Sequence, residues 1–176
     1  GFADRLGRAD QADGWRRRAD ETLAQLVTRL WDGKRFCCIS TVTGKAASPS
    51  DSVFNCLPII LGQRLPHEIR AALAADIKRH TTDWGPATEH PDSPVYEADG
   101  YWRGPIWAPS TMILIDGAQR AGETDLARDL ATRFCNLCDK SGFAENFDAV
   151  TGAPLRDRGY TWTSSVFLVL ANRYLR

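Results

Sequence analysis

Three segments of this chain are apolar on nearly every side of a helix, and each alternates with a helix that has one apolar face. The apolar segments begin near Ser50, at Pro105 and near Tyr160. A helix that is apolar all round is buried, whereas a helix with one apolar stripe covers a core. The stripes of the amphipathic segments follow helical spacing: Leu23, Leu26, Val27 and Leu30; Ile69, Leu73 and Ile77; Leu126, Leu130, Phe134 and Leu137. The pattern predicts an all-α fold with buried helices inside and amphipathic helices outside.

Prolines and glycines set the expected helix boundaries. Pro66 and Pro105 suit first helical positions, where the missing N–H costs nothing. Pro58 is expected to kink the helix that contains it. Gly122 and Gly142 are expected to end the helices that precede them. The first amphipathic helix is expected to end near residue 31, and the last helix to span about 160–174.

The connections between these helices differ in length in a regular way. Those from a buried to an amphipathic helix are a few residues, whereas those in the other direction run to about eighteen to twenty-six, against a usual median of about four to six. Successive helices run up and down, so the long loops are expected to gather on one face, at the N-termini of the buried helices. Long loops on a helical scaffold are where function tends to lie. We expect residues 1–176 to form a single all-α domain.

Charge and cysteine content exclude several classes of function. The 22 basic and 22 acidic residues give zero formal net charge, so nothing indicates binding to nucleic acid or to an anionic membrane. No apolar run approaches the roughly 18 residues of a membrane span. Cys135 and Cys138 form a CxxC, but no second CxxC or histidine pair completes a zinc site, so packing of free thiols is favoured. We expect a cytoplasmic protein with no metal and no cofactor.

Polar and aromatic residues gather at three junctions between a long loop and a buried helix. The first is Ser48-Pro49-Ser50-Asp51-Ser52, where Asp51 or Ser50 is expected to cap a helix. The second is Tyr101-Trp102-Arg103-Gly104-Pro105-Ile106-Trp107. The third is Glu145-Asn146-Phe147-Asp148 with Thr151-Gly152, followed by Tyr160-Thr161-Trp162. These junctions carry the candidate functional residues.

The second junction admits two interpretations. Flat aromatic faces with a few polar tips suit a sugar pocket, and they equally suit a large hydrophobic core. Gly104 is expected to allow a close backbone approach. The second junction is expected on the face where the long loops lie together, and this position favours the pocket.

At the third junction, Glu145 is the candidate catalytic carboxylate. Phe143 and Phe147 are expected to flank it and to desolvate it partly, which favours general-base chemistry. A solvated or capping carboxylate is the alternative from the residues alone. Asp148 with Thr151-Gly152 indicates a turn with a structural role.

The three motifs Tyr-Trp-Arg-Gly-Pro-Ile-Trp, Glu-Asn-Phe-Asp-x-x-Thr-Gly and Tyr-Thr-Trp-Thr-Ser, in this order, resemble the C-terminal part of glycoside hydrolase family 63 and its mannosylglycerate-hydrolase-like relatives. The resemblance extends from about Trp31 onward and implies an (α/α)6 barrel, a toroid of six helical hairpins, of which this chain supplies roughly the C-terminal half. It also implies an inverting reaction, in which a general acid protonates the leaving oxygen and a general base activates water.

The same resemblance assigns roles to single residues. Glu145 corresponds to the general base. Tyr101, Trp102 and Trp107 would wall the subsite of the cleaved sugar, Arg103 would bind a substrate oxygen or brace the loop, and Trp162 would be a second wall or a core anchor. Asn146 replaces an aromatic residue of the family motif, and Ala149 replaces a proline, which affects loop rigidity.

The family's general acid, an aspartate in a Trp-Asp-x-Ser-Pro-like loop, has no counterpart in this sequence. The chain begins at Gly1 without an initiator Met, which fits a fragment, a processed product or the ordered part of something longer. A partial toroid would leave the flanks of its inner helices bare. We therefore expect the remainder of the barrel on a longer parent chain or on a partner.

The sequence thus predicts an inverting glycoside hydrolase that acts on a small α-linked glucoside, mannoside or glycosylglycerate. The alternative is a truncated or degenerate toroid that binds carbohydrate or a protein. A third class, isoprenoid cyclases, is disfavoured because the sequence contains no Asp-rich metal motif.

Overall fold

The computed structural model describes residues 1–45 and 50–175, in two compact units, Gly1–Ala46 and Ala47–Arg176. The first junction's Ser48 and Pro49 lie outside the described residues. A single domain over residues 1–176 stays a prediction.

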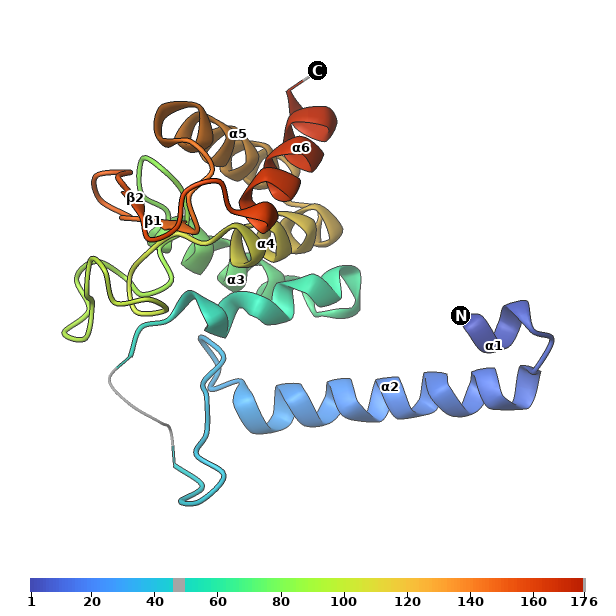
Figure 1. Cartoon of the computed structure of the whole chain (residues 1–176). Coiled ribbons are helices and arrows are strands. Elements are labelled where there is room, and N and C mark those ends of the chain that lie inside the picture. Colours follow the sequence, from blue (N-terminus) through green and yellow to red (C-terminus); the bar gives the residue numbers. More distant parts are fainter. Residues whose placement is uncertain (46–49, 176) are drawn as a thin grey trace. The chain divides into compact units, whose positions relative to one another are not determined.

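The first unit consists mainly of one long helix. α1 (Phe2–Arg5) is a single turn, and α2 (Ala9–Leu30) follows it (Figure 1). After α2 the chain reverses at Asp32, whose Oδ1 accepts hydrogen bonds from the backbone N–H groups of residues 34 and 35 at 2.8 and 2.7 Å. A β-bridge then joins Trp31 to Phe36. The amphipathic helix predicted to end near residue 31 is confirmed.

The second unit contains the core and all three candidate motifs. Its elements are η1 (Val53–Arg64), α3 (His67–His80), α4 (Ala108–Ala121), α5 (Thr124–Ser141), β1 (Asn146–Phe147), β2 (Pro154–Leu155) and α6 (Thr161–Tyr174). β1 and β2 form a short antiparallel hairpin, with Asn146 opposite Leu155. α4 packs against η1, α5 and α6, and α3 packs against η1. α4 is therefore the central helix of this unit.

The C-terminal helix ends predicted at Gly122 and Gly142 are confirmed. Gly122 adopts a left-handed conformation with φ 90° directly after α4. Gly142 has φ 75° directly after α5. A residue with a Cβ is strained at such angles, which explains why glycine ends both helices.

Two predictions about helix starts were wrong. α4 begins at Ala108 rather than at Pro105, because the backbone N–H and C=O of Ile106 pair with Phe147 in a β-bridge and hold residues 105 and 106 extended. The proline in the first turn of α4 is Pro109. At the first junction the cap is Ser52, whose Oγ accepts from the N–H of Phe54, rather than Asp51 or Ser50.

The buried helix expected after Ser50 is present in a tighter form. η1 is a 3-10 helix that includes Pro58, and its chain turns sharply at Gly62, where φ is 56°. A Cβ at Gly62 would lie 2.7 Å from the backbone oxygen of Arg120. The close approach of η1 to the end of α4 thus requires glycine at this position.

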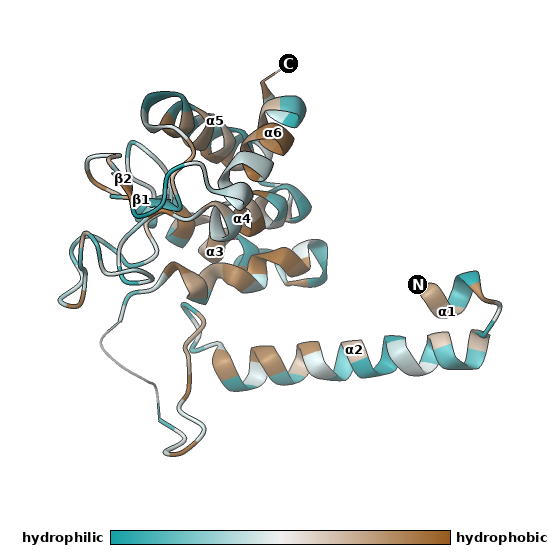
Figure 2. Cartoon of the chain, viewed as in Figure 1, coloured by the Kyte–Doolittle hydropathy of each residue, from teal (hydrophilic) through white to brown (hydrophobic). Residues whose placement is uncertain are grey.

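Burial separates the helices only partly as the sequence pattern indicates. α4 buries residues on several sides, as expected. Figure 2 shows that η1 is hydrophobic along most of its length, but it fully buries only every third residue, Val53, Cys56, Ile59 and Gly62. α5 buries one stripe and exposes the opposite face. α6, expected to be buried all round, buries only Thr163 and Leu170 and leaves Leu168 67% exposed. The described residues therefore leave an apolar flank of α6 uncovered.

Candidate active site

Backbone pairing brings the three junctions together. One β-bridge joins Ser52, at the start of η1, to Glu89 in the loop that precedes α4, and another joins Ile106 to Phe147. Thr88 lies at the centre of this arrangement. Its backbone oxygen accepts from the N–H of Val53 at 3.1 Å, and its hydroxyl donates to the oxygen of Pro105 at 2.8 Å. The expectation that long loops gather at the N-termini of the inner helices is confirmed for the loops that precede α4 and α6, which pair with each other at Ile106 and Phe147. For the loop that precedes η1, most of which belongs to the first unit, it stays a prediction.

The aromatic motif is presented by a tight loop. The N–H of Glu97 donates to the oxygen of Arg103 at 2.8 Å, which folds residues 97–103 back on themselves. A Cβ at Gly104 would collide with the backbone oxygen of Glu97. The close backbone approach predicted for Gly104 is therefore present.

Four aromatic side chains form one cluster. The rings of Trp102 and Trp107 stack with centroids 4.0 Å apart and an interplanar angle of 19°. Tyr101 meets Trp107 edge to face at 4.7 Å, and Trp162 of α6 does so at 5.4 Å. Trp107 is fully buried, whereas Tyr101 is 44% exposed and Trp102 and Trp162 are half-buried. Trp107 thus supports the other rings from behind, and Tyr101, Trp102 and Trp162 supply the accessible surface.

The indole nitrogens fix this cluster to the backbone of both motifs. Trp107 Nε1–H donates to the oxygen of Tyr101 at 2.8 Å. Trp162 Nε1–H donates to the oxygen of Glu145 at 3.3 Å. Trp162 therefore contacts the aromatic cluster through its ring and the candidate base through its nitrogen.

Glu145 lies directly before β1 and is held by its backbone. Its N–H donates to the oxygen of Asp157 at 2.8 Å, across the hairpin. Burial, together with the neighbouring Glu145 carboxylate, raises the pKa of the Tyr160 phenol. Tyr101 and Asp157 raise this pKa further. The Glu145 carboxylate is thus a neighbour of the Tyr160 phenol, whose ring lies 5.0 Å from that of Trp162.

The two phenylalanines beside Glu145 make their ring contacts with helices of the second unit. Phe147 is fully buried and meets Phe134 of α5 at 6.3 Å, while Phe143 packs against Phe167 of α6 at 5.3 Å. Both rings contact other helices, because strand pairing at 147 turns that ring into the core. The aromatic groups near Glu145 are Trp162 and Tyr160, and these come from α6 and its N-cap.

Arg103 braces the loop in this structure. Its guanidinium lies 2.8 Å from the carboxylate of Glu97, and both side chains are about half exposed. Of the two roles expected for Arg103, the contact with a carboxylate is the one present here.

Asp148 forms the predicted turn. Its Oδ1 accepts from the N–H groups of Val150 and Thr151 at 2.8 and 2.7 Å. Gly152 then has φ 68°, and a Cβ there would lie 2.7 Å from the ring of Trp84. This turn connects β1 to β2 and so fixes the strand that follows Glu145.

Asn146, which replaces the aromatic residue of the family motif, is fully buried. Neither its Oδ1 nor its Nδ2 has a hydrogen-bond partner within the described part of the chain. The burial explains why an aromatic side chain suits this position, and it shows that Asn146 faces the interior beside Glu145.

Sequence reasoning missed a buried polar network beneath the first junction. Glu89 is 1% exposed and accepts hydrogen bonds from the N–H of Asp51 and the hydroxyls of Ser50 and Ser93. His80, also fully buried, places its two ring nitrogens 2.9 Å from the backbone oxygens of Asp51 and Asp76. Glu89 is a single glutamate in a long loop, and no pattern in the neighbouring sequence predicts its burial.

Asp51 belongs to this network. Arg79 donates to both of its carboxylate oxygens, at 2.6 and 2.8 Å, and thereby lowers the pKa of Asp51. The side chain thus ties the start of η1 to the end of α3, where a helix cap was expected.

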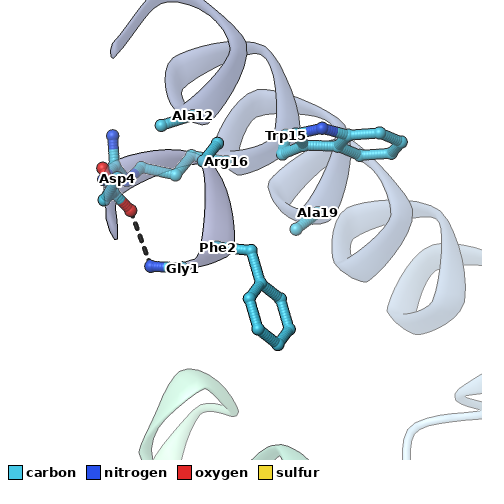
Figure 3. Close-up of a pocket in the computed structure, with 8 residues that line it drawn as sticks. Gly1, Phe2, Asp4, Ala12, Trp15, Arg16 and Ala19 are labelled. Atoms are coloured by element: carbon cyan, nitrogen blue, oxygen red, sulfur yellow. Dashed lines mark hydrogen bonds and ion pairs between the residues drawn. The ribbon is translucent and has the colours of Figure 1, made fainter. Parts of the chain in front are cut away.

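A separate pocket of about 410 Å³ lies in the first unit, between α1 and α2 (Figure 3). Phe2 and Trp15 line it and are 84% and 63% exposed. Its one carboxylate, Asp4, is engaged by Arg16. It contains none of the motif residues.

Over residues 1–45 and 50–175, no cluster of three or more histidine, cysteine or acidic side chains is arranged to hold a metal ion. Within the same residues, no helix combines the length and apolarity needed to cross a membrane.

The comparisons with known proteins complete this picture. A family model described as the mannosylglycerate hydrolase MGH1-like glycoside hydrolase domain matches residues 1–163. The chain belongs to this family. Mannosylglycerate hydrolase of Rubrobacter radiotolerans is 28% identical over 173 residues, which cover 90% of this chain and 37% of that protein. Mannosylglycerate hydrolase of Thermus thermophilus is 30% identical over 118 residues, which cover 64% of this chain and 27% of that protein. The MGH1-like chain thus spans well under half the length of these relatives.

Solved structures establish the fold of this MGH1-like chain. The crystal structure of a GH63 mannosylglycerate hydrolase from Thermus thermophilus in complex with glucose matches with a TM-score of 0.80 and 24% identity, over 96% of this chain and 40% of that chain. Neutral trehalase Nth1 of Saccharomyces cerevisiae matches with a TM-score of 0.72 and 16% identity, over 90% of this chain and 30% of that chain. The fold is therefore part of an (α/α)6 barrel, as predicted.

Proposed function

We propose that the complete protein containing this chain is an inverting glycoside hydrolase that cleaves a small α-linked sugar of the glycosylglycerate type. One observation carries the proposal. Trp162 joins the two motifs, because its ring meets Trp107 and its Nε1–H binds the backbone of Glu145. This contact supports a common site for the candidate base and the partly exposed aromatic rings.

In this proposal Glu145 is the general base. It removes a proton from a water molecule, which attacks the anomeric carbon from the face opposite the leaving oxygen. Tyr101, Trp102 and Trp162 hold the cleaved sugar against their rings, with Trp107 behind them. Arg103 keeps the loop folded through Glu97.

The general acid and the opposite wall of the pocket come from outside residues 1–176. An inverting pair needs two carboxyl groups roughly 6.5–9.5 Å apart, so the acid must face Glu145 across the sugar. The uncovered residues of the inner helices, Ile113 at 40% and Leu168 at 67% exposure, support a ring completed by further helices on the same parent chain or on a partner.

The substrate class is proposed from the relatives. Named relatives are hydrolases of mannosylglycerate and of glucosylglycerate, so these two compounds are the first substrates to assay. Both combine an α-linked sugar, which the aromatic rings would hold, with a small anionic leaving group.

The decisive experiment compares the complete protein with its Glu145→Gln variant. Loss of a general base is expected to lower kcat by about 10²- to 10⁴-fold, while calorimetry shows sugar binding retained. Glu68→Gln, the same chemical change at an exposed position in the first turn of α3, is the control and should keep full turnover.

The product's anomeric form tests the stereochemistry. An inverting enzyme releases the β-anomer from an α-linked substrate, which proton NMR detects before mutarotation. Unchanged turnover in Glu145→Gln would contradict the assignment of the base. Sugar binding by a wild-type protein without turnover would instead support the carbohydrate-binding alternative.

A further inference from the structure

Two residues other than glycine adopt a left-handed backbone conformation within residues 1–45 and 50–175. They are Tyr101 and Arg156, each with φ 60°. This conformation is unfavourable for residues with a Cβ and persists where surrounding contacts hold it. The two residues lie on different loops, one before α4 and one after β2, and they contact each other. The guanidinium of Arg156 lies 5.3 Å from the centroid of the Tyr101 ring.

Arg156 also binds the loop that carries Tyr101. Its Nη2–H donates to Asp99 Oδ1 at 2.7 Å and to the backbone oxygen of Asp99 at 3.3 Å. The side chains of Arg156 and Asp99 are 38% and 59% exposed. A pair so exposed contributes little to global stability. Its geometry is nevertheless specific, since one guanidinium contacts a carboxylate, a carbonyl and an aromatic face of the same loop.

Arg156 lies between the two residues that fix the backbone around Glu145. On one side, Leu155 pairs with Asn146 in the β hairpin. On the other, the oxygen of Asp157 accepts the N–H of Glu145 at 2.8 Å. A shift of residue 156 therefore moves both of these contacts, and with them the backbone of Glu145.

A continuous chain of contacts thus leads from the aromatic surface to the candidate base. It runs from the Tyr101 ring and Asp99 to Arg156, and from there through the backbone to Glu145. The direct link between the same two loops, the bridge of Ile106 to Phe147, lies in the buried interior. The Asp99–Arg156 contact is made at the exposed edge, on the side of Tyr101.

We propose that Arg156 is a positioning residue which, through Asp99 and Tyr101, sets the separation between the aromatic surface that holds the sugar and the carboxylate of Glu145. The proposal rests on the proposed glycosidase function. Arg156 does not touch the reacting atoms in this role. Its effect is on geometry, and a misplacement of about 1 Å can cost an enzyme about 10²-fold in rate.

The test uses the complete protein, four single variants and the double variant Arg156→Asn/Asp99→Asn. Arg156→Asn removes the guanidinium but keeps a residue that tolerates left-handed φ. Asp99→Asn removes the carboxylate partner. Arg156→Lys keeps the positive charge but not the forked donors. Arg158→Asn, an exposed arginine on the same loop, is the matched control.

If Arg156 positions the site, Arg156→Asn and Asp99→Asn should each lower kcat by about 10- to 100-fold with little change in KM. The double variant should lose little more than either single variant, because both break one contact. Arg156→Lys should recover part of the loss, and Arg158→Asn should match the wild type. A rise in KM confined to Arg156→Asn would mean that Arg156 binds substrate directly, and it would overturn the proposal.

Amide hydrogen exchange provides a readout that does not depend on activity. Arg156→Asn should speed exchange of the N–H groups of Glu145 and Arg103, both protected by loop hydrogen bonds, while α5 stays protected as in the wild type. Unchanged exchange at both positions overturns the proposal whether or not the protein is a glycosidase. Faster exchange in the Arg156→Asn variant of a protein that lacks glycosidase activity would keep the contact and reject the proposed function.

Discussion

α2 and α4 are both regular helices, yet they differ in how much of their apolar surface is buried. α4 buries eight of its 14 residues against η1, α5 and α6. α2 is longer, with 22 residues, and buries only Ala12. Its stripe of Leu23, Leu26, Val27 and Leu30 is half-buried at each position. Most helical stability in proteins comes from packing of an apolar face, so the second unit holds its own core and the first does not.

The difference shows that an amphipathic pattern predicts a helix but not the element that packs against it. The period of the apolar residues predicts a helix in both cases, and both helices are present. The pattern indicates which face needs a partner, but the partner is supplied by other parts of the chain. For α4 those parts lie within 50–175, whereas for α2 the described residues of the first unit supply the single turn of α1.

Truncating one buried and one exposed apolar side chain should give the largest contrast between the units. Leu130→Ala in α5, at a fully buried position, should lower the free energy of unfolding by about 2–5 kcal/mol. Trp15→Ala in α2, at 63% exposure, should change it by less than about 0.5 kcal/mol. Urea unfolding followed by circular dichroism measures both. A loss at Trp15 as large as at Leu130 would erase the contrast and would mean that α2 is covered in the complete protein.

Two glycine substitutions test packing with opposite expected signs. A Cβ at Gly117 of α4 would lie 2.5 Å from Ile59 Cγ2, so Gly117→Ala should lower the free energy of unfolding by about 1–3 kcal/mol. At Gly14 of α2 a Cβ meets nothing within 4 Å. Gly14→Ala should therefore increase stability by about 0.5–1 kcal/mol through helix propensity. Thermal unfolding of the two variants measures the sign of each stability change. A loss of stability in Gly14→Ala would show that Gly14 is closely packed.

The smallest contrast concerns one ion pair in each unit. Arg79 lowers the pKa of Asp51 below 3.8, so the pair stabilises the fold above that pH and loses its contribution as the pH falls through the lowered pKa. Asp51→Asn should cost about 1 kcal/mol at pH 7 and progressively less below about pH 3.8. Asp13→Asn in α2, whose pair with Arg16 is more than half exposed, should cost less than about 0.5 kcal/mol.

The measurement is the free energy of unfolding of both variants between about pH 2 and pH 7. A cost for Asp51→Asn that stays constant over this range would assign the effect to neutral hydrogen bonds. Equal costs for the two variants would remove the distinction between the partly buried pair of the second unit and the more exposed pair of the first.

The helices and the three motifs at their junctions could be predicted from the sequence, and so could the inner position of α4 and the outer position of α5. These features depend on short-range rules: apolar spacing within a helix, glycine after its last turn, and the two N–H groups that Asp148 accepts within its own turn. The close approach at Gly104 also followed, since few residue types allow a backbone carbonyl so near.

How the motif residues share the site became visible only once the helices and loops had been placed in space. Phe147 faces Phe134 because its backbone pairing with Ile106 fixes the direction of the side chain. The same pairing keeps residues 105 and 106 out of α4, which therefore begins at Ala108. Trp162, rather than either phenylalanine, contacts the backbone of Glu145. The contact of Arg156 with Asp99 joins residues 57 apart in sequence. Such contacts depend on how the loops are placed by the packed helices, and local sequence patterns do not predict them.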